Sequence, residues 1–157
     1  MPGIALDTNV LVYSEGLERT PADRAKIIRS QALLEALSLS GEDWVIPAQA
    51  LAELHSVLVR RGRRTPRQAS ATVSRVAWLC DVAPTSPQVL AAALELAGDH
   101  RLQVYDAIIL AGAELARCDL LLSEDMHDGF AWRSLTVTNP FRQAPDARVA
   151  ALLATIP

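Results

Sequence analysis

The sequence has few cysteines, few lysines and few aromatic residues, and no apolar run reaches the length of a membrane span. Its two cysteines, Cys80 and Cys118, form no CxxC motif, so we expect buried free thiols in a reducing cytoplasm. Lys26 is the only lysine, and aromatic residues make up 4% of the chain. This composition argues against a membrane protein, a disulfide scaffold and a surface built from many stacked rings.

The composition that remains is that of a globular protein. Half of the 157 residues are hydrophobic and 21% are charged, which fits one folded domain over residues 1–157 with a short C-terminal tail from about residue 142. The net charge of −3 does not by itself suggest that the protein binds nucleic acid. Five arginines nevertheless fall in one short stretch, and we expect them either to follow a nucleic-acid backbone or to form a solvated turn. They are Arg60, Arg61, Arg63, Arg64 and Arg67.

Short apolar runs alternate with longer amphipathic segments along the chain. Strands are predicted at residues 4–6, 44–46, 120–122 and 135–138, with a weaker candidate at 82–83. Helices are predicted at residues 8–15, 22–39, 48–59, 66–79, 87–98 and 104–116. This alternation is typical of an α/β fold in three layers, with a central parallel sheet of about five short strands and helices on both faces.

Four acidic residues stand where such a fold places its chemistry, near the carboxyl ends of the strands. Asp7 and Asp125 directly follow strands, whereas Glu53 and Asp106 lie in apolar helical stretches. Two carboxylates about 4 Å apart repel by roughly 1 kcal/mol in water and by about 4 kcal/mol at an effective dielectric constant near 20. Because the only lysine and the arginines are expected elsewhere, a divalent cation is the simplest way to balance four converging acids.

Each acid also has a purely structural interpretation. Asp7 can cap the helix that follows it, Glu53 can be a solvated helix residue, and Asp106 can interact favourably with a helix N-terminus. The acids of the last loop, which include Asp125 and Asp128, can form an ordinary solvated surface. The joint placement of the four acids, rather than any one of them, favours a metal site.

Four motifs together resemble those of PIN-domain nucleases. Residues 6–13 (LDTNVLVY) are similar to the opening motif of that family, and residues 52–54 (AEL), 105–109 (YDAII) and 121–126 (LLSEDM) follow in the family's order. The resemblance spans about residues 3–141, and the size of the chain is similar to that of VapC-type toxins of bacterial toxin–antitoxin pairs. Ser123 stands where the family often has threonine. By motif the fourth acid is Asp125, with Asp128 as a possible supplement.

The resemblance implies an endoribonuclease that depends on Mg²⁺ or Mn²⁺, is usually a homodimer and is held inactive by a cognate antitoxin. Oxygen ligands without histidine or cysteine suit these ions better than zinc. We expect three of the acids to hold metal directly or through water, and Glu53 to bind through water or to orient the attacking water. The metal-holding acids are Asp7, Asp106 and Asp125, and the supporting residues are Thr8, Asn9, Ser123 and Asp128. Attack by water on RNA would leave a 5′-phosphate and a 3′-hydroxyl.

Other functions remain open at the level of sequence. A phosphoryl-transfer enzyme with a nucleophilic aspartate would need a second acid where Asn9 stands and a lysine later than Lys26. A metal-free ribonuclease would rely on histidines, but His55, His100 and His127 are scattered. The chain can also be an RNA-processing nuclease without an antitoxin, or a non-catalytic module that binds RNA or protein. The apolar residues 149–156 are expected to form an intramolecular cap or a partner contact.

Overall fold

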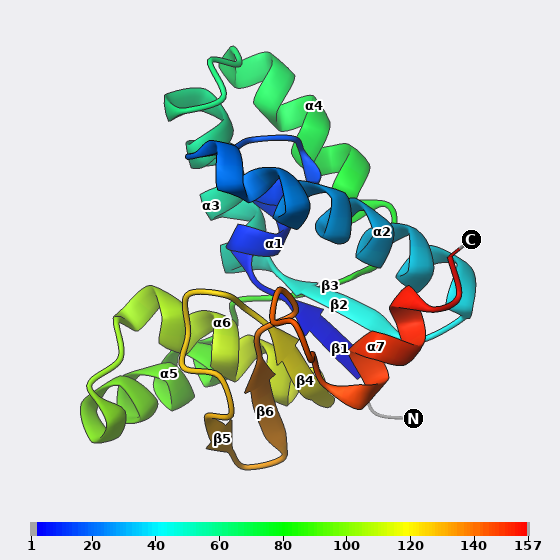
Figure 1. The fold of residues 1–157 in the computed structure, drawn as a ribbon. Helices are drawn as coiled ribbons and strands as arrows, with labels where there is room; N and C mark the ends of the chain where they lie inside the picture. The colour runs from blue at the N-terminus through cyan, green and yellow to red at the C-terminus, as the bar shows by residue number, and fades with distance from the viewer. Residues whose placement is uncertain (1–2, 157) are drawn as a thin grey trace.

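A six-stranded sheet forms the centre of the computed structural model, which describes residues 3–156 (Figure 1). Met1, Pro2 and Pro157 belong to the predicted domain but lie outside the described residues. The strand order is β3-β2-β1-β4-β6-β5, and every pairing is parallel except that of β5 with β6. The strands are β1 (Gly3–Leu6), β2 (Trp44–Pro47), β3 (Asp81–Ala83), β4 (Cys118–Leu122), β5 (Ala131–Trp132) and β6 (Leu135–Thr138).

The predicted α/β class is confirmed, and the sheet has one strand more than expected. The additional strand, β5, is only two residues long, too short for an alternating pattern to reveal it. It pairs Trp132 with Leu135 across a tight turn in which Arg133 has a φ of 53°. The central strand β1 lies between β2 and β4 and is buried throughout, which explains its uninterrupted apolar sequence.

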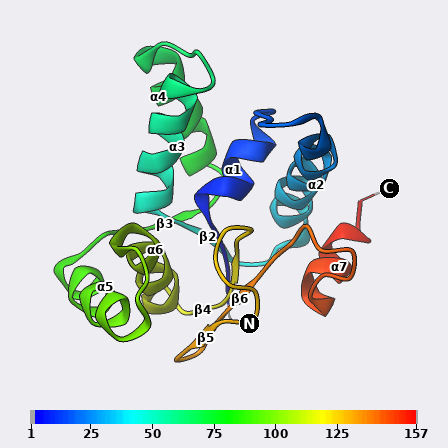
Figure 2. The ribbon, with the colours of Figure 1, turned by 60° about the vertical axis from the view of Figure 1, so that its left-hand side comes forward.

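Helices cover both faces of this sheet, as Figures 1 and 2 show. The helices α5 and α6 lie on one side, and α1, α2 and α7 lie on the other. The pair α3–α4 stands beyond the end of the sheet where β1 leads into α1. The helices are α1 (Thr8–Ser14), α2 (Arg24–Ser40), α3 (Ala48–Arg60), α4 (Pro66–Ala77), α5 (Pro87–His100), α6 (Val104–Leu115) and α7 (Ala147–Leu153), and a short 3₁₀ helix (Pro21–Asp23) precedes α2. Within residues 3–156, no helix combines the length and the apolar character needed to cross a membrane.

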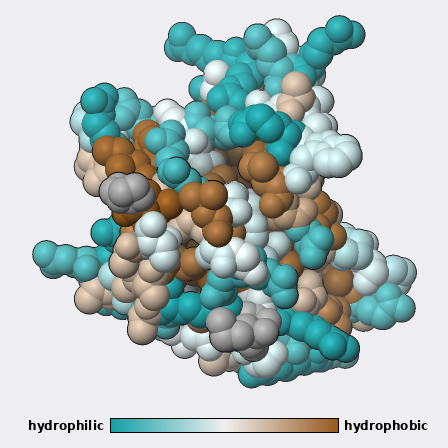
Figure 3. All heavy atoms as spheres, turned by 90° about the vertical axis from the view of Figure 1, so that its right-hand side faces the viewer, coloured by the Kyte–Doolittle hydropathy of each residue, from teal (hydrophilic) through white to brown (hydrophobic). Residues whose placement is uncertain are grey.

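The C-terminal tail folds back on the domain as α7. Val149 and Leu152 are buried and α7 packs against α2, so the apolar tail is an intramolecular cap, one of the two expected roles. Arg148 anchors the helix by donating to Asp119 Oδ1 at 2.6 Å and to Glu42 Oε2 at 2.7 Å. Figure 3 shows this side of the molecule, where apolar side chains gather in the middle of the face with hydrophilic ones around them.

Candidate active site

Asp7 lies at the carboxyl end of β1, where the chain turns into α1. Its Oδ1 accepts a hydrogen bond from the Thr8 backbone N–H at 2.6 Å, so the predicted capping role is real. Its Oδ2 accepts from Asn9 Nδ2 at 2.8 Å and from Ser123 Oγ at 2.6 Å. Capping therefore occupies one oxygen, while side chains from two elements orient the other.

The environment of Asp7 opposes its ionisation. The side chain is almost fully buried, and desolvation raises its pKa from 3.8 to about 7 despite the hydrogen bonds from Ser123 and Thr8. The negative charges of Asp106 and Glu53 make a smaller contribution to this rise. A cation at this site would offset these effects and keep the carboxylate ionised at neutral pH.

Asn9 and Ser123 connect α1 to the loop after β4. Asn9 lies inside α1 rather than capping it, and its Oδ1 accepts from the Glu124 backbone N–H at 3.1 Å. Ser123 Oγ also accepts from the backbone N–H of Met126 at 3.2 Å. These bonds fix the position of the loop relative to Asp7.

Glu53 reaches the site from α3. Its Oε2 accepts from Thr8 Oγ1 at 3.1 Å and its Oε1 from Gln49 Nε2 at 3.0 Å. The residue is half-buried, so it is not the freely solvated helix acid of the structural interpretation. Thr8 thus links the helix that follows Asp7 to the second acid.

Asp106 lies in the first turn of α6 and is half-buried. Desolvation raises its pKa, and the charges of Glu53 and Asp125 add to the rise. Such mutual repulsion is expected where carboxylates converge. It shows that Asp106 on α6 lies near Glu53 on α3 and near Asp125 in the loop after β4.

The loop after β4 carries three acids, and the structure separates their roles. Asp125 lines the same cavity as the other candidate acids. Glu124 instead forms an ion pair with Lys26 and accepts from Tyr13 Oη at 2.8 Å. Asp128, which we expected to support the site, does not line the cavity.

Asp128 has a structural role. It accepts from the Asn139 backbone N–H at 2.7 Å and pairs with Arg142, and these interactions lower its pKa. The sequence could not reveal this, because the partners of Asp128 lie 11 and 14 residues further along the chain.

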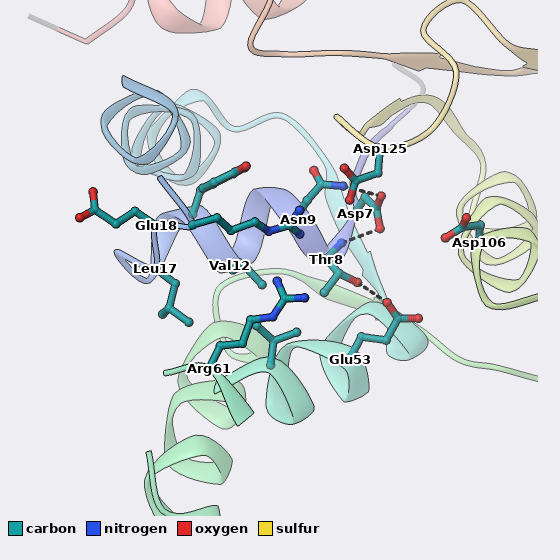
Figure 4. Close-up of a pocket in the computed structure, with 13 residues that line it drawn as sticks. Asp7, Thr8, Asn9, Val12, Leu17, Glu18, Glu53, Arg61, Asp106 and Asp125 are labelled. Atoms are coloured by element: carbon teal, nitrogen blue, oxygen red, sulfur yellow. Dashed lines mark hydrogen bonds between the residues drawn. The ribbon is translucent and has the colours of Figure 1, made fainter. Parts of the chain in front are cut away.

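One cavity of about 200 Å³ brings the four acids together, and Figure 4 shows their side chains approaching it from separate segments. None of the four forms an ion pair with any residue of the described part of the chain. Within residues 3–156, no three Asp, Glu, His or Cys side chains are close enough together to form a metal site by themselves. The donor set nevertheless fits Mg²⁺, which keeps several waters and usually takes only one or two carboxylates.

The sequence-based prediction that all arginines lie away from the four acids is wrong. Arg61, at the end of α3, lines the cavity, and so does Arg19. A sequence separation of eight residues places Arg61 near the face of α3 that carries Glu53. By contrast, Arg64 donates to Glu15 Oε2 at 3.0 Å, so this member of the predicted RNA-binding run holds the fold together.

No histidine of the described chain lines the cavity. His55 Nε2 is 3.2 Å from Ser70 Oγ, and His100 packs edge-on against Phe130. The histidine-based alternative therefore has no support from the geometry. The nucleophilic-aspartate alternative has none either, because Lys26 is held by Glu124 and Asp23.

Comparisons with known proteins agree on the fold. The chain is similar to VapBC2 from Rickettsia felis, solved bound to a DNA fragment from its promoter, with 17% identity, a TM-score of 0.61 and coverage of 87% of this chain and 97% of the other. It is also similar to VapC20 from Mycobacterium tuberculosis, described as a toxin that cleaves the sarcin–ricin loop, with 18% identity, a TM-score of 0.59 and coverage of 78% and 90%. No curated protein sequence matches. The model of the PIN domain matches residues 4–130, and the chain therefore belongs to the PIN-domain family.

Proposed function

We propose that this protein is an endoribonuclease that depends on Mg²⁺ or Mn²⁺. The observation that carries the proposal is that four acids line one cavity, where burial and mutual repulsion raise the pKa of Asp7 to about 7 and no cation within residues 3–156 pairs with them. A protein that only needed stability would gain nothing from this arrangement.

Asp7, Asp106 and Asp125 would hold the ion directly or through water. When bound, the ion would lower the pKa of a water molecule and offset negative charge on the scissile phosphate. Glu53 accepts hydrogen bonds from Thr8 and Gln49, and it would bind the ion through water or orient the attacking water. Asn9 and Ser123 keep Asp7 in one orientation through their hydrogen bonds.

The substrate that we propose is RNA, and the positive charge that attracts it lies at the end of α3. Arg61 lines the cavity and Arg60 lies in the neighbouring groove. Guanidinium groups suit phosphate because they bind it with two parallel hydrogen bonds. Among the five clustered arginines we therefore assign phosphate binding to Arg60 and Arg61.

We further propose that the protein is the toxin of a toxin–antitoxin pair, acts in the cytoplasm and forms a homodimer. The similar structures support an antitoxin partner, because one from Klebsiella pneumoniae is described as a toxin–antitoxin complex. Exposed apolar side chains at the ends of α2 and α4 support a protein partner as well. These are Leu39 (74% exposed), Trp78 (88%) and Leu79 (46%).

The deciding experiment compares cleavage of labelled RNA with Mg²⁺, with Mn²⁺ and with EDTA. We expect cleavage only with metal, products with 5′-phosphate ends, and a rate reduced at least about a hundredfold in Asp7→Asn and Asp106→Asn. Asp128→Asn is the matched control, because this acid lies outside the cavity, and it should retain activity. Cleavage in EDTA, or full cleavage activity of the Asp7 variant, would refute the proposal and favour a metal-free ribonuclease. Absence of cleavage under all three conditions would refute it in favour of the non-catalytic module.

A further inference from the structure

The acids of the candidate site border two depressions. The first is the cavity that contains Asp7, and the second is a groove of about 430 Å³. Glu53 and Asp106 line both of them. A bound single strand of nucleic acid that passes over these two acids would therefore enter both depressions. The remaining side chains of the groove are polar or aromatic apart from Ala52, and they are Gln49, Ser56, Arg60, Gln103 and Tyr105.

Arg60 and Arg61 place one guanidinium group in each depression. Consecutive residues at the end of a helix diverge by about 100°, so Arg61 points into the cavity, as Figure 4 shows, while Arg60 lines the groove. Neither side chain has a hydrogen bond or an ion pair within residues 3–156. Both are available to phosphates on either side of the acids, unlike Arg64, which Glu15 holds.

Tyr105 supplies an exposed aromatic ring to the groove. It lies in the first turn of α6, directly before Asp106, and is 59% exposed. Phe130 and Trp132, by comparison, pack partly against the core. An exposed ring beside a phosphate-binding group is the arrangement on which proteins stack single-stranded bases.

We infer that this groove is a second nucleotide subsite for single-stranded RNA, next to the scissile position. Tyr105 stacks on the base of the flanking nucleotide and Arg60 binds its phosphate, while Ser56 and Gln103 offer hydrogen bonds to the base edge. A base within a duplex is already stacked on its neighbours and cannot reach the ring. The identity of the ligand as RNA rests on the proposed function, but the subsite makes its own prediction about binding.

The test measures binding without cleavage. Binding of labelled rA₈ and rU₈ is measured by fluorescence anisotropy. The parent protein is Asp7→Asn, and two further proteins combine this substitution with Tyr105→Ala or with Tyr105→Phe. We expect Tyr105→Ala to weaken binding about tenfold and Tyr105→Phe to bind within about twofold of the parent, since the phenyl ring still stacks. Trp78→Ala removes another exposed ring and should leave the affinity unchanged. Duplex RNA of the same length should bind more weakly than either single strand.

Arg60 is tested through the salt dependence of the same binding. Arg60→Ala should reduce the slope of log affinity against log salt by about one, as expected when one phosphate contact is lost. Arg67→Ala is the matched control, because Arg67 belongs to the same run of arginines and lines neither depression, and its slope should not change.

The outcomes separate the subsite from the proposed activity. If wild-type protein cleaves RNA with metal but Tyr105→Ala binds as well as the parent, the subsite is wrong and the nuclease stands. If binding depends on Tyr105 but no metal supports cleavage, the subsite stands and the nuclease is wrong. Equal affinity for duplex and single strand would also overturn the subsite. Unchanged thermal unfolding of Tyr105→Ala will confirm that the variant is folded.

Discussion

The acids that line the cavity and the acids at the amino ends of the strands are treated in opposite ways. At the amino ends of the strands, Asp119 and Glu42 share the guanidinium group of Arg148. In the cavity, Asp7 and Asp106 have raised pKa values and no ion pair with the described residues. Pairing is thus used where the fold must be held together, and it is withheld where a cation is expected to bind.

The contrast between paired and unpaired acids should have its largest effect on how the free energy of unfolding depends on pH in the presence of EDTA. Because the pKa of Asp7 is about 7 in the folded protein and near 3.8 when unfolded, the folded state binds more protons between pH 4 and 7. The free energy of unfolding should therefore fall as pH rises through this window, by up to about 4 kcal/mol from this group, and stay low above it. Urea unfolding at several pH values will measure the fall.

Asp7→Asn provides the control for that measurement, since it removes the titrating group. The difference in stability between wild type and variant should change between pH 4 and 7 and be constant above pH 7. A difference that does not vary with pH would mean that Asp7 is ionised without assistance, and the contrast between the two ends would disappear.

Added Mg²⁺ should offset the destabilisation caused by the ionised acids of the cavity and should not affect the ion pairs at the amino ends of the strands. At a concentration about 100 times the dissociation constant, a ligand that binds only the folded state stabilises it by about 2.7 kcal/mol. Thermal unfolding should show this gain in wild type and much less of it in Asp106→Asn. An equal gain in both proteins would place the ion somewhere else.

At the amino end, Arg148→Ala should lower the free energy of unfolding by about 2 kcal/mol, because it leaves two partly buried carboxylates without their partner. Chemical denaturation measures the loss. Arg75→Ala removes a more exposed ion pair with Glu15 and should cost less than about 1 kcal/mol. The stabilisation of the Arg148 variant by Mg²⁺ should equal that of wild type, which separates the two ends.

The smallest expected effect concerns the hydrogen bond that orients Asp7. Ser123→Ala should lower kcat/KM about tenfold and move the acidic limb of the activity profile to higher pH, because that bond lowers the pKa of Asp7. Ser123→Thr retains the hydroxyl and should restore both values. A rate loss without a shift in the profile would contradict this positioning role.

The sequence by itself indicated the layer structure and the four acids that line the cavity, with Asp125 favoured over Asp128 by motif alone. Uninterrupted apolar runs of strand length, separated by helical periodicity, were enough to predict a parallel sheet, since only a sheet covered on both faces buries such strands completely. Asp7, Glu53 and Asp106 followed from their places in that pattern and from the motifs. The two-residue β5 and the helical form of α7 were missed, because short segments are fixed by what they pack against.

Only the tertiary structure decided which polar residues share the site. Asp125 and Asp128 are neighbours in the same loop, yet one lines the cavity and the other pairs with Arg142. Likewise Arg61 joins the acids, whereas Arg64 is taken up by Glu15. A pattern along the chain gives the type of each side chain, but its direction and its partners depend on residues far away in sequence. For Asp7, the sequence supplied the carboxylate, and the burial created by the fold raised its pKa.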